Sequence, residues 1–269
     1  MTAGPVQHDI TREIWGDGDT ILLIFAGAAA EFAVNRAVDW LFFTGALPRD
    51  PLPRLFRTVR YAQSIAFACP GDAARTLKRI RQVHASVEWQ RGQAIPAWAH
   101  RAVLYMLIDY SERAAHLLRG PLGATRQEAL YADFRRIGRG LGVVDLPPTY
   151  AAWKTDRARR LTEDLAWSPL TARLYEAYRH HLGPVRYELL RRIQAVLVPS
   201  HVRTMLRLPI SVSGPSLLAG WRAIRALRLG PVARRLVVPP PHWGDLGRLE
   251  RVHRGRATDE SSLGSAWLP

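Results

Sequence analysis

The chain has 269 residues, of which 48% are apolar, enough for the core of one large domain or of two small ones. Its single cysteine, Cys69, excludes a disulfide framework or a cysteine-ligated metal cluster within one chain, which is typical of a reducing compartment. The formal net charge is +15, but the 38 basic residues, only two of them lysine, are spread along the whole sequence. The charge is therefore only a weak indication of a nucleic acid or membrane partner.

The N-terminal part of the sequence predicts a buried helix. The first residues lack a basic segment followed by an apolar one, so we expect no secretory signal and a cytoplasmic protein. The apolar run 21–30 is about half the roughly 20 residues that a membrane-spanning helix needs, and we interpret it as core. Thr20 is a suitable N-cap for a helix over 21–43. Three prolines within 45–53 then predict a loop.

The rest of the sequence predicts further helices and no strands. Caps, prolines and glycines place helices at 54–68, from Asp72 through residue 84, 98–118, from Thr125 to 140, from Thr149, from Ser168-Pro169 to 181, 184–198, after Pro199 and 216–229. Residues 92–96 break the pattern, as does the GLGVVDLPPTY segment. We therefore predict an all-α, multi-helix bundle in a single domain over 1–235, with an irregular C-terminal tail over 236–269.

A histidine lies within the apolar stripe of one predicted helix. His84 follows Ile80 by four residues and precedes Val87 by three, so the three side chains share a face, while Arg79 points away from it. Arg81 flanks His84 on nearly the same side. An inward imidazole is either a buried structural residue bonded to a carbonyl or a metal or haem ligand, and by itself the former is the commoner case.

The helix upstream carries polar residues on one face. Arg54 and Thr58 are four residues apart, with Arg57 beside them. The planar fork of an arginine suits a carboxylate, because it donates two parallel hydrogen bonds. Downstream, His100 could line a pocket with these residues, although we favour an ordinary position at the core boundary. No two histidines have the HxxxH spacing of a zinc site, so we expect no zinc.

These residues together resemble a known family. The run DPLPRLFRTVRYAQSIAFACPGDAARTLKRIRQVHASV, with Arg54, Arg57-Thr58 and Arg81-x-x-His84, is similar to the central signature of the DUF2236 family of rubber oxygenases and MpaB-type oxygenases. The later segments WAHRAVLYMLIDYSERA, YADF…GLGVVDLPPTY and LVPSHVR resemble the family in order and spacing. The resemblance covers about residues 15–209, and its specificity comes from the order of the pieces.

The resemblance implies a haem enzyme. It implies a globin-like helical core that binds haem b without a covalent bond, with His84 as the axial ligand of the iron. Arg81 and Arg57 would contact the cofactor, and Arg54 and Thr58 would line the reaction pocket. The implied reaction inserts dioxygen across a carbon–carbon double bond of an isoprenoid or similar lipid-like substrate. An apolar pocket between helices, with a neutral imidazole, suits both a porphyrin and such a substrate.

The sequence departs from the family pattern in places, which keeps alternatives open. Glu88 and Trp89 stand where rubber oxygenases carry further basic and histidine residues. The carboxylate proposed as a base in that branch has no clear match, and Glu31 and Asp39 are the candidates. The expected partners are dioxygen and an apolar small molecule, with peripheral membrane contact allowed and nucleic acid not expected. The alternatives are a basic helical protein that binds nucleic acid or a membrane surface, and a family member without haem.

Overall fold

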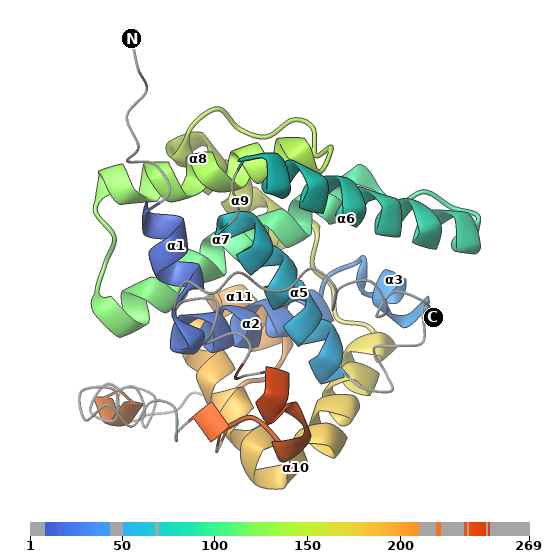
Figure 1. Ribbon diagram of the computed structural model, residues 1–269. Helices are drawn as coiled ribbons and strands as arrows, with labels where there is room; N and C mark the ends of the chain where they lie inside the picture. The colour runs from blue at the N-terminus through green and yellow to red at the C-terminus, as the bar shows by residue number, and fades with distance from the viewer. Residues whose placement is uncertain are drawn as a thin grey trace.

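The computed structural model describes residues 9–43, 51–67, 70–209, 219–221, 234–235, 237–245 and 247. Within these ranges the chain is helical, and the only strand-like pairing is a single bridge between Asn35 and Leu165. The all-α prediction is therefore confirmed. The elements in chain order are α1 Asp9–Trp15, α2 Gly18–Ala33, α3 Val38–Phe43, α5 Pro51–Ala66, α6 Pro70–Arg91, α7 Ala97–Arg119, α8 Ala124–Gly140, α9 Tyr150–Glu163, α10 Pro169–Leu197, α11 Ser200–Met205 and the 3-10 turn η1 Pro240–His242 (Figure 1).

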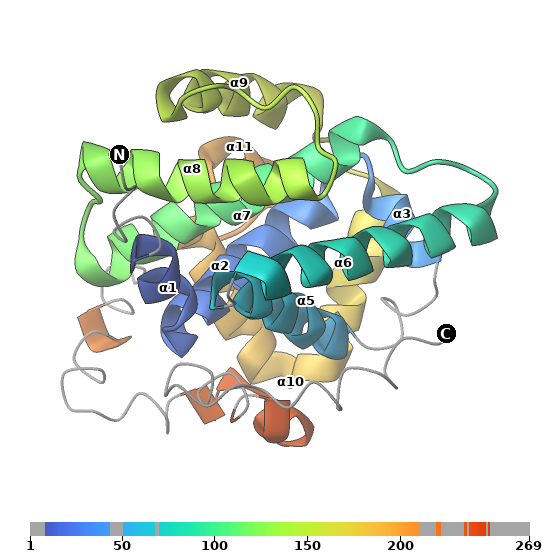
Figure 2. The ribbon, with the colours of Figure 1, turned by 45° about the horizontal axis from the view of Figure 1, so that its top comes forward.

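Helices α2 and α7 form the centre of the bundle. They pack more extensively than any other pair, and α10 and α1 also lie against α2. Both views show α2 enclosed by other helices (Figures 1 and 2). Most of its apolar run is buried, which confirms the prediction of a core helix. Gly27 permits the close approach of α7, because a Cβ there would lie 2.2 Å from Cδ1 of Tyr110.

The predicted helix over 21–43 is interrupted. Asp17, not Thr20, is the N-cap, and its side chain accepts a hydrogen bond from the Asp19 amide. The helix ends at Ala33, where Asn35 pairs with Leu165 and its side chain accepts from the Ala37 amide. These contacts satisfy the backbone outside a helix, so the chain turns and begins again as α3.

Other helix boundaries follow local capping chemistry. Thr149 caps α9 by accepting from the Ala152 amide, and Ser168 begins α10 with a capping box, both as predicted. Gly183 has a φ of 72° and produces a kink at the predicted break, although α10 continues to Leu197. Asp72 and Thr125 lie inside their helices instead of capping them.

Helices α5 and α6 each begin at a proline that the sequence pattern places in a preceding loop or break. Helix α5 starts at Pro51, so the predicted loop over 45–53 is wrong for its last three residues, and 44–50 lie outside the described residues. A proline is tolerated in the first turn because its missing amide hydrogen has no helical partner there. Helix α6 similarly starts at Pro70, and it packs against α5 and α8.

Part of the expected C-terminal tail lies against α5. Val238 belongs to the buried core, and the ring of His242 stacks on Phe56 with 5.8 Å between centroids. Asp245 forms an ion pair with Arg60, with 3.0 Å between the atoms. Residues 237–245 therefore pack on the bundle, whereas 248–269 and most of the predicted helix over 216–229 lie outside the described residues. The domain boundary at 235 stays a prediction.

Candidate functional site

Helix α6 presents one face to the bundle and one to water. Ile80, His84 and Val87 are half-buried, whereas Arg79 is exposed, so the predicted orientation of the helix is confirmed. No α6 residue with a described side chain is fully buried. The imidazole of His84 therefore faces inward from a loosely packed helix and lies in a half-buried apolar surface.

A second histidine lies directly beside His84. The ring of His100, in the first turns of α7, is 4.7 Å from that of His84 between centroids, with 41° between the planes. Burial lowers the pKa of His100, and the nearby carboxylate of Glu88 only partly opposes this effect. His100 is therefore neutral at pH 7, and a neutral imidazole offers one nitrogen as a proton acceptor or metal ligand. His100 is half-buried, as expected of a residue at the core boundary, and it also lies against His84.

Glu88 connects the two histidine-bearing helices. It follows His84 by one helical turn, and its Oε1 accepts a hydrogen bond of 2.8 Å from the Ile95 amide. Ile95 belongs to the short break between α6 and α7. This break starts at Gly92, whose φ is 65°. The bond fixes the connection between α6 and α7 and thereby the approach of the two rings. The residue that departs from the family pattern thus has a structural role here.

The upstream residues Arg54, Arg57 and Thr58 lie on α5, a helix that packs against α6. Helix α5 lies against α6, and Thr58 is half-buried on it. Arg54 and Thr58 lie on one helix at the predicted spacing of one turn, but the side chains of Arg54 and Arg57 are outside the described residues. Arg81 donates to the Gly140 carbonyl at 3.0 Å, so its guanidinium reaches toward α8.

Glu31 takes part in a buried ion network. Its two carboxylate oxygens accept from Arg157 at 2.7 and 2.6 Å, and the Tyr110 hydroxyl donates to one of them at 2.9 Å. The same guanidinium also donates to Asp109. Along α7, Tyr110 lies ten residues beyond His100, which corresponds to about 15 Å of helix. The structure therefore anchors Glu31 to a different part of α7 from the two histidines.

The second candidate carboxylate is also paired. Asp39 on α3 forms an ion pair of 2.6 Å with Arg91, the last residue of α6. The guanidinium of Arg91 also lies 3.8 Å above the ring of Trp40. Arg91 is seven residues beyond His84, about 10 Å along the helix. Neither Glu31 nor Asp39 contacts His84 through any interaction that the described residues make.

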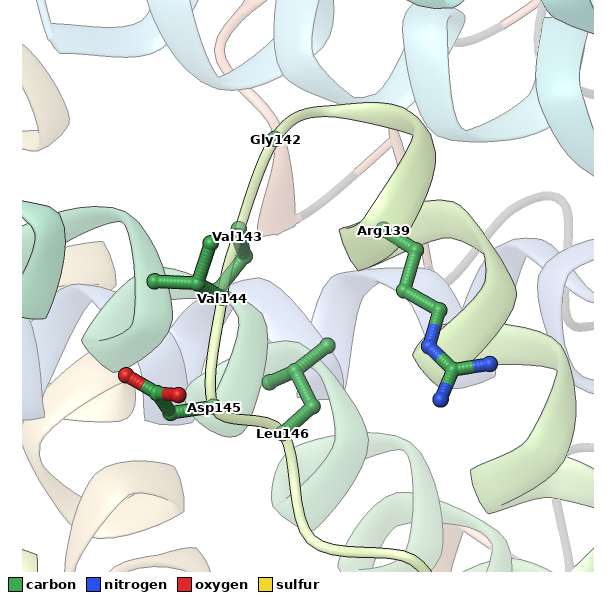
Figure 3. Close-up of a pocket in the computed structure, with 6 residues that line it drawn as sticks. All are labelled: Arg139, Gly142, Val143, Val144, Asp145 and Leu146. Atoms are coloured by element: carbon green, nitrogen blue, oxygen red, sulfur yellow. The ribbon is translucent and has the colours of Figure 1, made fainter.

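A separate open hollow of about 370 Å³ lies at the end of α8 (Figure 3). It is lined by residues of α8 and the following turn: Arg139, Gly142, Val143, Val144, Asp145 and Leu146. Asp145 has a φ of 57°, an unusual backbone conformation for a residue that is not glycine. This end of α8 contacts α6 through Gly140, where an added Cβ would lie 2.6 Å from Leu77. The hollow is thus adjacent to α6 but does not include the histidine pair.

The described residues contain neither a metal-binding cluster nor a membrane-spanning helix. Among the described residues, no three histidine, cysteine or acidic side chains gather closely enough to hold a metal ion. In the same residues, no helix has the length and apolar character needed to cross a membrane.

Comparison with known proteins gives a family match over most of the chain. The model described as "ER-bound oxygenase mpaB/B'/Rubber oxygenase, catalytic domain" matches residues 12–235. The matched range contains α2, α5, α6 and α7 in full, and with them both histidines. No curated protein and no solved structure matched the chain.

Proposed function

Because the chain belongs to the catalytic-domain family of the mpaB and rubber oxygenases, we propose that it is a haem b-dependent oxygenase with His84 as the axial ligand of the iron. We propose further that its substrate is an unsaturated isoprenoid or similar lipid-like molecule. The observation that carries the proposal is the pair of half-buried imidazoles on α6 and α7, within the range that matches an oxygenase family.

The residues around His84 fit a flat, mostly apolar group. The apolar stripe of α6, which includes Leu77, Ile80 and Val87, is only half-buried, so this face leaves apolar surface for a ligand to cover. Haem iron takes a histidine imidazole as its proximal ligand, and His84 offers its imidazole from this half-buried apolar face. When bound, haem would supply the activation of dioxygen, for which protein side chains have no equivalent.

The chain itself would bind and orient the cofactor and its substrate. We propose that Arg57 and Arg81 contact the cofactor, since a guanidinium suits the carboxylates of its propionates, and that Arg54 and Thr58 line the reaction pocket. The ring of His100 restricts the orientation of the His84 imidazole, because two rings 4.7 Å apart cannot turn independently. Glu31 and Asp39 stay candidates for a base, although each is paired with an arginine.

A family member that keeps the fold without haem is the main alternative, because His84 already packs against another side chain. Visible absorption of the full chain, purified after expression with a haem precursor, separates the two. The proposal predicts an intense haem band for the wild type and for His201→Ala, an exposed histidine on α11, and the loss of the band in His84→Ala. A wild type that is colourless and binds no added haem would contradict the proposal.

A further inference from the structure

The outward face of α6 carries cations and a tryptophan, and the two carboxylates of this helix lie at the borders of that face. Successive helix residues turn by about 100°, so the residues within roughly 80° of Trp89 form one continuous face. The charged residues on this face are Arg75, Lys78, Arg79 and, at its border with the His84 side, Arg81, and all are exposed. The two acidic residues of α6, Asp72 and Glu88, lie at the borders of the face and are half-buried. We call these four cations and Trp89 the basic face.

Part of the positive charge on the basic face is uncompensated. Arg75 is paired with Asp72, and Arg81 donates to a neutral carbonyl. Lys78 and Arg79 make no ion pair with any residue in the described ranges. A strip in which cations outnumber carboxylates attracts an anionic partner, and the attraction decreases as salt is added.

Trp89 adds an apolar anchor at the end of this face. Its side chain is 83% exposed, the most exposed of the large apolar side chains in the described part of the chain. Phe43, 43% exposed, lies beside the same end of α6, because Arg91 stacks on its ring as well as on Trp40. Both views show this end of α6 at the edge of the molecule next to α3 (Figures 1 and 2). Exposed aromatic rings next to arginines are typical of surfaces that enter the headgroup region of a bilayer.

We propose that the basic face docks on an anionic lipid surface, with Trp89 inserted at the headgroup boundary. The cations explain why the face would prefer anionic lipid to neutral lipid. The exposed indole favours a bilayer as the partner, because a polyanion such as duplex nucleic acid offers it no apolar layer to enter. The link to catalysis rests on the proposed function, in which the substrate is apolar and partitions into membranes. Because His84 lies on the opposite face of the same helix, docking would bring the pocket to within about 10 Å of the lipid.

Flotation or sedimentation with vesicles tests this proposal on the full chain. The probe is phosphatidylcholine vesicles in which about a third of the lipid is phosphatidylserine, compared with pure phosphatidylcholine. We expect binding to the anionic vesicles that weakens with salt. Each cation near such a surface contributes about 1 kcal/mol, so Lys78→Gln with Arg79→Gln should weaken binding about 30-fold. Trp89→Ala should weaken it about tenfold, and Trp89→Phe much less, because it keeps an aromatic anchor.

A matched control separates local docking from net charge. Arg179→Gln with Arg192→Gln removes the same charge from exposed positions on α10, and it should leave vesicle binding within about twofold of the wild type. Equal losses in the two double variants would show that only the net charge attracts lipid, and no binding by the wild type would also overturn the proposal. Tighter binding to a single-stranded oligonucleotide than to vesicles, lost in the Trp89→Ala variant, would assign the face to nucleic acid instead.

The vesicle assay does not depend on haem. A chain that shows the haem band but binds no vesicles refutes the docking proposal and leaves the proposed function intact. A chain that binds vesicles through Lys78, Arg79 and Trp89 but takes up no haem retains the docking surface and loses the proposed function.

Discussion

Replacement of Arg157 by leucine should strongly destabilise the fold. The guanidinium is buried between the carboxylates of Glu31 and Asp109, which are 1% and 3% exposed. It donates hydrogen bonds to both carboxylate oxygens of Glu31 and to one of Asp109. After the substitution Glu31 would keep only the Tyr110 hydroxyl, and Asp109 only Arg113. Breaking a buried ion pair on one side costs about 3–5 kcal/mol, a large part of a typical stability of about 5–15 kcal/mol.

Chemical denaturation of the variant, followed by circular dichroism, measures this loss. Arg159→Leu is the control, because Arg159 is ion-paired with Asp156 on the same helix but is exposed, and its loss should cost far less stability than that of Arg157. The double variant Glu31→Leu with Arg157→Leu should recover part of the loss, since it removes one of the two stranded carboxylates. If Arg157→Leu and Arg159→Leu have equal effects, the interpretation of the network as a structural element is wrong.

The network also predicts how stability depends on pH. Burial by itself would raise the pKa of Asp109, but the guanidinium groups of Arg157 and Arg113 outweigh it and hold the pKa below its ordinary value. The folded state therefore keeps this carboxylate ionised when the unfolded chain takes up a proton. Asp109 stabilises the fold at pH values above its ordinary pKa, and this contribution disappears as the pH falls through the lower pKa of the folded state.

Three further outcomes follow from individual residues. Gly27→Ala should cost up to about 3 kcal/mol in denaturation experiments, since its Cβ would overlap the Tyr110 ring, whereas Gly71→Ala at an open position should cost nothing. Thr149→Ala should lose about 1 kcal/mol of stability with its N-cap bond, and an unchanged denaturation midpoint would contradict the capping role. The ring protons of His100, followed by NMR, should titrate below the ordinary pKa of 6.5, and a midpoint at or above that value would show that the ring is not buried.

The features that the sequence predicted correctly depend on local chemistry. The N-cap of Thr149, the start of α10 at Ser168 and the break before α7 each depend on side chains within a few residues of the boundary. The face of His84 follows from the spacing of its apolar neighbours alone. Such features can be predicted because helix geometry places residues three or four apart side by side.

The features that the sequence did not reveal depend on partners far away in the chain. The break after α2 is fixed by the pairing of Asn35 with Leu165, which no periodicity in 21–43 indicates. Glu31 pairs with Arg157, which lies 126 residues further along the chain, and no sequence spacing indicates that contact. The contact of His84 with His100 depends on the angle between α6 and α7, although the short connection between the helices was a usable signal.

The most direct test of the central claim is haem titration of His84→Ala in the presence and absence of free imidazole. If His84 ligates the iron, the variant should bind haem weakly or without the spectrum of the wild type, and added imidazole should restore that spectrum by filling the vacated position. His100→Ala should keep haem bound, with a shifted band if its ring orients the ligand. Wild-type and His84→Ala chains with identical haem affinity and spectra would contradict the account and leave His84 as a structural histidine.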